Sequence, residues 1–391
     1  GPAAAIGASR ARVQTRSHCM GRTLSVLAPS VSMVWNAMVS LWFTQALLPT
    51  GWATGVRARI EGNSIASVET GVAPAPGDDR HGPAFPGLAN VHSHAFQRGM
   101  AGLAEAAGPA DDDFWTWRET MYRFVLTLDP DRIEALAALA FAEMAEAGFT
   151  TVGEFHYLHH APDGAPYANR AELAERIAAA AASAGIGLTL LPVFYAHGNF
   201  GGAAPGPRQA RFLNTPDGYA ALLDCCRAAI APLKDARLGV APHSLRAATL
   251  DEVRAVAALA KGGPIHIHAA EQTREVEDCL AHFGARPVDV LLDRIGLAAR
   301  WCLVHATHLT ESETKRLAQS GATAGLCPVT ESNLGDGVFP APAYLAAGGR
   351  FGIGTDSNIL ISAADELKAL EYIQRLVRRA RNVLAPPHGS T

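Results

Sequence analysis

The sequence predicts an α/β fold in which eight parallel strands form a (β/α)₈ barrel, with a small β domain before it. Two observations lead to this prediction. From Pro83 onward, short apolar runs alternate with helix-like stretches, a pattern typical of a parallel sheet that is buried on both faces. Eight such runs occur, and eight strand–helix units are what this barrel requires.

Each apolar run ends in polar or ionisable residues. The runs are 84–91 before His92 and His94, 150–155 before His156 and Tyr157, 188–195 before His197, 238–242 before His243, 264–267 around His266 and His268, 302–304 before His305, 323–327 before Thr330 and Glu331, and 351–354 before Asp356. Helices are expected between them, over 131–147, 171–185, 217–231, 250–260, 311–320 and 363–380. Since barrel active sites lie where the C-terminal strand ends meet, these residues predict a site there. An open doubly wound sheet would carry a glycine-rich loop after its first strand, where this chain has Asn-Val-His-Ser-His.

The small β domain is expected over residues 38–84, and the barrel over 85–385. Strand candidates are 41–48, 55–60 and 65–70. Three short strands do not close a stable sandwich, so we expect partner strands from elsewhere and a β-sandwich that is incomplete here. Residues 1–37 are expected to be a disordered extension before a natural start at Met38. Residues 386–391 are expected to be a tail, with further strands beyond it.

Composition and charge exclude several classes of protein. A net charge of −4 offers no basic surface for nucleic acid. Six cysteines without a Cys-x-x-Cys pair do not form a disulfide framework and favour the cytoplasm. The uncharged run from Thr23 to Val56 follows four arginines. Because basic residues also precede membrane anchors, an anchor is an alternative interpretation of this segment. Because Pro29, Asn36 and Pro49 interrupt that run, we expect no membrane insertion.

Two His-x-His pairs and one aspartate predict a metal site. In His92-Ser-His94 both imidazoles point to the same side, because side chains alternate along a strand. His266 and His268 form a second pair, and Asp356 ends the last strand. Histidines with one carboxylate describe a catalytic site for one Zn²⁺ or Fe²⁺ with a position open for water. None of the four lysines follows a strand, so no lysine is expected to bridge a second metal.

Three residues are candidates for moving protons. Glu271 stands three residues after His268, where a carboxylate can take a proton from water and give it to a leaving nitrogen. His305 can stabilise an oxyanion, and Asp356 can accept a proton while it binds the metal. The alternative for Glu271 is an exposed residue in the first turn of a helix that starts at Thr273.

These segments resemble the amidohydrolase superfamily and, more closely, its formimidoylglutamate deiminase branch. The resemblance covers residues 40–385 and is carried by His92–Glu105, Phe114–Arg118, Gly153–His160, Ala241–Arg246, His266–Gln272, Leu326–Asp336 and Gly354–Ser357. It implies Zn²⁺ held by His92, His94, His268 and Asp356, with Fe²⁺ or Mn²⁺ as alternatives, and Glu271 as the proton acceptor. It also implies a homodimer, His266 behind the ligands, and substrate contacts from Gln97, Arg118, Tyr157, His243 and Arg246.

The activity implied is hydrolysis of the formimino C=N group of N-formimino-L-glutamate, in histidine degradation. Paired arginines suit a substrate with two carboxylates, although each arginine alone could equally form a surface ion pair. One alternative is a deaminase of a purine, pterin or other heterocycle, for which we expect stacking aromatic residues in place of the arginines. Another is a barrel that binds metal or ligand without turnover, against which Glu271 argues.

Overall fold

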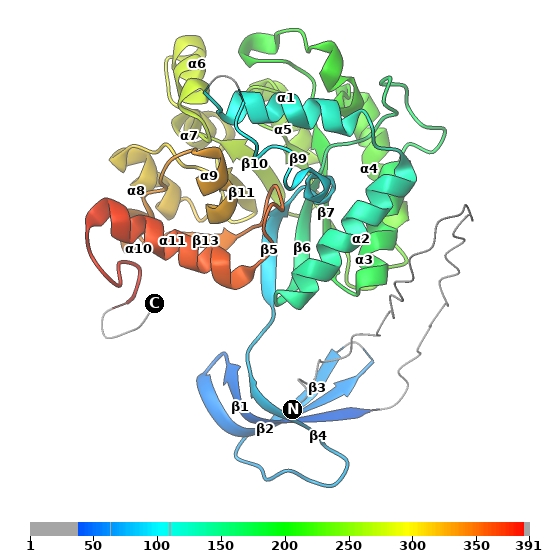
Figure 1. The fold of residues 1–391 in the computed structure, drawn as a ribbon, viewed down its shortest axis with the longest axis vertical. Coiled ribbons are helices and arrows are strands. Elements are labelled where there is room, and N and C mark those ends of the chain that lie inside the picture. Colours follow the sequence, from blue (N-terminus) through cyan, green and yellow to red (C-terminus); the bar gives the residue numbers. More distant parts are fainter. Residues whose placement is uncertain (1–37, 63, 109–110, 387–391) are drawn as a thin grey trace. The chain divides into compact units, whose positions relative to one another are not determined.

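The computed structural model of the chain describes residues 38–62, 64–108 and 111–386. The chain divides into two compact units, and the boundary lies between Gly87 and Leu88 (Figure 1). The expected extension over residues 1–37 lies outside the described residues, and so do residues 387–391 of the expected tail.

The first unit contains one four-stranded sheet in the order β3-β2-β1-β4. Its strands are β1 (Val39–Leu48), β2 (Gly51–Glu61), β3 (Ser64–Glu69) and β4 (Asp79–Ala84). β1 and β2 form an antiparallel hairpin, whose turn needs the positive φ of 107° at Gly51. Phe43, Ala46, Val56 and Ala58 form a small apolar core on this sheet. All three strand candidates are therefore strands.

The fourth strand of this sheet was not predicted. β4 pairs parallel with β1, and most of its side chains are exposed. Its sequence Asp-Arg-His-Gly-Pro-Ala lacks the alternation of apolar and polar residues that marks a half-buried strand. Because β4 pairs only with β1, Pro83 lies at a sheet edge, where a missing N–H is tolerated.

The second half of the uncharged run belongs to this sheet, since residues 39–48 and 51–56 lie in β1 and β2. Among the residues that the structure describes, no helix is long and apolar enough to cross a membrane.

The second unit is the predicted (β/α)₈ barrel (Figure 1). Its strands are β5 (Leu88–Ser93), β6 (Phe149–His156), β7 (Gly187–Phe194), β8 (Arg237–Leu238), β9 (Ala241–Pro242), β10 (Ile265–Ala269), β11 (Trp301–His305), β12 (Thr323–Leu326) and β13 (Arg350–Ile353). β8 and β9 both pair with β7 in one continuous register, so together they are the fourth barrel strand. Parallel bridges from Val240 to Ile265 and from Ser93 to Asp356 close the barrel.

Helices follow the strands and form the outer layer (Figure 1). They are α2 (Pro130–Glu146), α3 (Glu172–Ala184), α4 (Pro216–Ile230), α5 (Leu250–Ala258), α6 (Thr273–Phe283), α7 (Pro287–Val290), α8 (Glu311–Gln319), α10 (Ala341–Ala346) and α11 (Ala363–Arg378). Local sequence sets their ends. Capping boxes of Thr249 with Glu252 and of Thr310 with Glu313 start α5 and α8, whereas left-handed glycines Gly185 and Gly284 end α3 and α6.

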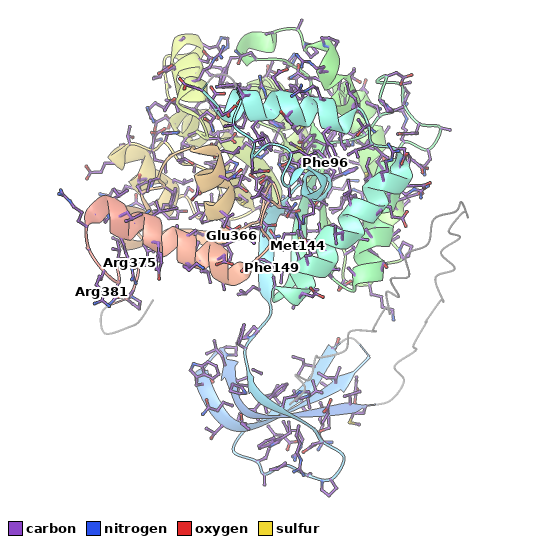
Figure 2. All side chains as sticks on the ribbon, in the orientation of Figure 1. Phe96, Met144, Phe149, Glu366, Arg375 and Arg381 are labelled. Atoms are coloured by element: carbon purple, nitrogen blue, oxygen red, sulfur yellow. The ribbon has the colours of Figure 1, made fainter. Side chains whose placement is uncertain are left out.

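Further helices and turns stand at the C-terminal ends of the strands. They are α1 (Phe114–Val125), α9 (Pro328–Leu334) and the 3₁₀ turns η1 (Ala95–Met100), η2 (Phe200–Gly202) and η3 (Pro207–Phe212), while the π-helical turn η4 (Leu291–Ile295) follows α7. The core lies between barrel and helices, where Met144 of α2 and Phe149 of β6 are fully buried (Figure 2). Glu366 of α11, also labelled there, accepts a hydrogen bond from the Val329 amide of α9 at 2.9 Å.

Candidate metal centre and active site

A pocket opens at the C-terminal ends of the barrel strands, where the sequence predicts the site. Every predicted site residue except His92 lines it, namely His94, Gln97, Arg118, Tyr157, His243, Arg246, His268, Glu271, His305 and Asp356. His92 is fully buried beneath it, with its Nε2 3.2 Å from Nε2 of His94. The structure therefore brings all the predicted residues together.

Four side chains form a group that can hold a metal ion. Ligand atoms of His92, His94, His268 and Asp356 all lie within 4.8 Å of one another. His92 Nε2 is 3.2 Å from Nε2 of both other histidines and 3.3 Å from Asp356 Oδ1. Two ligand atoms that are each about 2.1 Å from a tetrahedral ion lie about 3.4 Å apart. The spacing of the four atoms therefore fits one bound metal.

The hydrogen bonds behind the histidines support the same conclusion. His94 Nδ1 lies 2.9 Å from the Phe155 carbonyl, and His268 Nδ1 lies 3.1 Å from the His243 carbonyl. A carbonyl only accepts, so in both rings Nδ1 carries the proton and Nε2 keeps a free lone pair. His266 lies outside this group, although it is on the same strand as His268.

Burial keeps the three histidines neutral, as metal ligands must be. It lowers the pKa of His92 to about 3 and that of His268 well below its usual value. The pKa of His94 is also lowered by burial. For Asp356, burial acts upward, but the hydrogen bond with His92 and the neighbouring imidazoles hold its pKa below the usual range.

The backbone around these ligands is unusual. Ala270, His305, Ala306, Asp356 and Asn358 have positive φ, and they are five of the eight non-glycine residues with this conformation in the described part of the chain. Such conformations cost energy and gather at functional sites. Here they let the chain turn sharply at the ends of β10, β11 and β13, which aims the side chains at one point.

A buried polar network joins the first and last barrel strands behind the metal group. Asn90 donates to Thr355 Oγ1 at 2.7 Å, and Thr355 donates to Asn358 Oδ1 at 2.6 Å. Asn358 in turn donates to the His94 carbonyl at 3.0 Å. Sequence reasoning missed this network. Asn90, a polar residue inside an otherwise apolar strand, was the sequence feature that could have indicated this network.

Glu271 lies beside the metal group and is 5 % exposed. This rules out the alternative of an exposed helical residue, since α6 begins only at Thr273. Burial raises the pKa of Glu271 to about 7, although His305 and Arg246 act in the opposite direction. A carboxyl group with a pKa near neutrality can both accept and donate a proton under working conditions.

His305 is surrounded by three carboxylates. Its Nδ1 is 3.2 Å from Glu331 Oε1, and its Nε2 is 3.8 Å from Glu271 Oε1 and 3.9 Å from Asp356 Oδ2. Burial opposes charge on the ring, but these carboxylates raise its pKa to about 10. In the metal-free site these carboxylates therefore favour the protonated form of His305, which lines the pocket. Its partner Glu331, which ends the seventh run, had no predicted role.

The rest of the pocket combines polar groups without protein partners and aromatic rings. Within the described residues, Gln97 Oε1, Arg118 Nε and Arg246 Nε are buried and have no hydrogen-bond partner. Gln97 Nε2 donates to the Tyr157 hydroxyl at 2.9 Å. Arg246 Nη2 lies 3.7 Å from Glu271 Oε2, so this arginine is not in a surface ion pair. Unpaired buried polar atoms of this kind are places where a ligand can bind.

His243 is partly buried between the metal group and a wall of mostly aromatic side chains. Its ring lies 4.8 Å from the rings of both His268 and Tyr195. Burial and nearby cations keep its pKa well below the usual value, so it is neutral and can donate or accept a hydrogen bond. Sequence reasoning missed this aromatic wall, which is formed by Phe114, Trp117, Met121, Tyr122, Tyr195, Phe212 and Leu334.

Comparison with known proteins places the chain among its relatives. Residues 84–389 match the model of the Amidohydrolase family, and residues 39–82 match "Formimidoylglutamate deiminase HutF, N-terminal domain". The chain is 51% identical over 351 residues to the formimidoylglutamate deiminase of Pseudomonas aeruginosa, an alignment that covers 89% of this chain and 77% of the relative. It is 29% identical over 309 residues to the 8-oxoguanine deaminase of the same organism, covering 75% of this chain and 64% of that protein.

Solved structures agree with these relationships. A crystal structure of an amidohydrolase from Brucella melitensis superposes with a TM-score of 0.88 at 59% identity, covering 90% of this chain and 78% of that one. An adenosine deaminase from Xanthomonas campestris with bound zinc shares the fold, with a TM-score of 0.68 at 21% identity over 87% of this chain and 74% of that one. The predicted resemblance and fold class are confirmed, and the chain belongs to the amidohydrolase family.

Proposed function

We propose that this chain hydrolyses N-formimino-L-glutamate to N-formyl-L-glutamate and ammonia, a step of histidine degradation, with one Zn²⁺ held by His92, His94, His268 and Asp356. One observation carries the proposal. Arg118 and Arg246, each with a buried Nε that lacks a partner, line the same pocket as the metal group and Glu271. This arrangement suits a molecule with an amidine at one end and two carboxylates at the other.

A metal ion held by His92, His94, His268 and Asp356 would supply Lewis acidity, which lowers the pKa of water toward about 7. Glu271 takes a proton from the attacking water as the oxygen bonds to the formimino carbon. It then passes that proton to the nitrogen that leaves, and the C–N bond breaks. Both protons of the water end on that nitrogen, so ammonia departs and a formyl C=O remains. Asp356 is a second acceptor for a water proton.

His305 stabilises the negative charge that develops on the former water oxygen, since the neighbouring carboxylates favour the protonated form of its ring. The substrate is oriented by Arg118 and Arg246 at the carboxylates, and by Gln97, Tyr157 and His243 through hydrogen bonds. The unpaired Nε atoms of Arg118 and Arg246 gain an acceptor when a carboxylate is present, which favours the acidic substrate over uncharged ones.

Purine and other heterocycle deaminases are the rival class. The pocket does contain stacking rings, among them Trp117 and Tyr122. However, these aromatic residues accompany the two arginines and do not replace them. An uncharged purine would leave the partly buried guanidinium group of Arg118 without a carboxylate and the buried Nε of Arg246 without a hydrogen-bond acceptor. The acidic substrate is therefore favoured.

The test is ammonia release from N-formimino-L-glutamate by zinc-loaded protein, with Glu271→Ala as the control. Release that disappears in the variant supports the reaction and the role of Glu271. Release from adenosine or guanine in preference to the acidic substrate contradicts the proposal. Metal analysis after loading with Zn²⁺, Fe²⁺ or Mn²⁺, followed by the same assay, identifies the working ion.

We also propose that the protein is a cytoplasmic homodimer. The cysteines that the structure describes are all free thiols, Cys225, Cys226, Cys279, Cys302 and Cys327, as a reducing compartment requires. The dimer rests on the family resemblance. Light scattering after size-exclusion chromatography tests it, and a monomer mass at micromolar concentration contradicts it.

A further inference from the structure

A second cavity adjoins the active-site pocket. It is lined by Trp115 and Arg118 from α1, by Asn199 beside η2, by Arg246, and by Arg274 and Asp278 from α6. Arg118 and Arg246 also line the inner pocket, so the two spaces meet at these arginines. The outer cavity has a volume of about 220 Å³.

Trp115 connects the arginines of two helices that are distant in sequence. The guanidinium carbon of Arg118 lies 4.4 Å from the centre of the Trp115 ring, and that of Arg274 lies 4.9 Å from it. Such cation–π contacts fix the plane of a guanidinium group without using its hydrogen-bond donors. The N–H groups of both arginines therefore stay available to a ligand.

The charge of the outer cavity is unbalanced. Its lining carries three guanidinium groups and one carboxylate, Asp278, which already accepts a hydrogen bond from Asn199 Nδ2 at 3.2 Å. Because Arg246 has the carboxylates of Glu271 and Glu275 within 4.0 Å, the imbalance lies at Arg118 and Arg274. Among the described residues, Arg118 and Arg274 have no carboxylate partner. By contrast, Arg176 on the outer helix α3 pairs with three carboxylates, those of Asp131, Glu134 and Glu172.

A buried guanidinium group, that of Arg246, also faces this space with one hydrogen-bond donor unused. Arg246 is 9 % exposed, and its Nε has no hydrogen bond within the described residues. Its nearest carboxylate oxygens are 3.7 and 4.0 Å away, on Glu271 and Glu275. Cations that share a small space without enough counter-charge repel one another, and an anion between them relieves that repulsion.

We propose that Arg274 and Trp115, together with Arg118, form an outer anion subsite that binds a carboxylate of the incoming substrate before it reaches the inner pocket. This rests on the proposed function, which supplies a substrate with two carboxylates. Arg274 is exposed and Arg246 is buried, so the cavity leads from solvent to the inner arginines. A cleft with one sign of charge raises the local concentration of the opposite charge and speeds capture.

The test compares Arg274→Gln with Arg300→Gln as a matched control. Both changes remove one exposed arginine, but Arg300 precedes β11, at the N-terminal end of that strand. We expect Arg274→Gln to lower kcat/KM for N-formimino-L-glutamate about 3- to 10-fold at low salt, with kcat within about twofold, and to lose most of this effect at 0.5 M NaCl. A loss confined to kcat, a loss that salt does not change, or an equal loss in Arg300→Gln overturns the subsite.

Binding of the expected product provides a readout that needs no turnover. Calorimetry with N-formyl-L-glutamate, a dianion, and N-formyl-L-glutamine, a monoanion, should show that Arg274→Gln weakens the dianion more. Equal weakening of both ligands overturns the subsite. If the wild-type protein releases no ammonia but still binds the dianion in an Arg274-dependent way, the proposed reaction fails while the subsite stands.

Discussion

The two sides of the active-site pocket differ in how their polar atoms are used. On the metal side, the ligand atoms of the histidines and Asp356 contact one another. Asn358 donates a hydrogen bond to the His94 carbonyl, and the His94 ring donates one to the Phe155 carbonyl. On the side of α1, Gln97, Arg118 and Arg246 keep buried atoms without partners. The ligand atoms of the metal side are therefore already brought together before a substrate arrives, whereas the unpaired atoms of the α1 side are available to the substrate. We propose that the metal side determines the chemistry and that the α1 side determines which molecule undergoes it.

The largest expected effect is on the metal side. Glu271→Gln keeps the size of the side chain but removes the proton acceptor, so we expect kcat to fall by about 10³-fold. The measurement is ammonia release at saturating substrate. Zinc content, measured by mass spectrometry, should remain that of the wild type, because Glu271 is not in the ligand group. Full activity in this variant would show that another residue moves the proton.

The next effect should fall on the α1 side. Arg118→Gln removes a charged hydrogen-bond donor, so we expect kcat/KM for the acidic substrate to fall by about 10- to 100-fold, mainly through KM. Arg123→Gln is the matched control, since Arg123 is an exposed residue of the same helix. If Arg118→Gln lowers kcat and leaves KM unchanged, the α1 side does not act through substrate binding, and the proposed difference between the two sides is wrong.

A substitution behind the metal ligands should weaken metal binding, although the substituted residue is not itself a ligand. Asn358→Ala removes the hydrogen bonds to the His94 carbonyl and to Ser93. Partners behind metal ligands typically contribute 10- to 100-fold in affinity, so we expect zinc to dissociate about that much more readily. Competition with a chelator measures this. Asn382→Ala, remote in sequence from the ligands, should leave zinc affinity unchanged.

The smallest effect is that of pH. Glu271 must be ionised to accept a proton, and burial raises its pKa to about 7 in the metal-free site. Activity should therefore fall as the pH drops below the pKa of Glu271, by no more than tenfold per pH unit. Bound Zn²⁺ adds positive charge nearby, which moves this limb of the pH profile below 7. A profile of kcat/KM from pH 5 to 8 shows the limb, and Glu271→Gln should lack it.

The two sides also differ in how far sequence predicts them. Three of the metal ligands follow from local rules, because His92 and His94 point the same way on one strand and Asp356 follows another. Glu271 and His305 are at strand ends for the same reason. Strand alternation does not distinguish His268 from His266, and that choice came from the family resemblance. The aromatic wall was not predictable in this way, since Tyr122 and Phe212 come from α1 and η3, whose positions over the barrel depend on tertiary packing. The Asn90–Thr355 hydrogen bond was not predictable either, because it joins residues 265 positions apart. The strand β4 was missed because its sequence lacks an apolar pattern.

The bridge between Ser93 and Asp356 has a consequence for the order of events during synthesis. It joins the first and last barrel strands, and the metal group needs side chains from both. At about 5–20 residues per second, the ribosome needs tens of seconds to pass from His94 to Asp356. During that time the first two histidines have neither their aspartate nor their partner strand. Tight metal capture must therefore follow translation of nearly the whole barrel, and a nascent chain stalled before Asp356 should hold zinc only weakly.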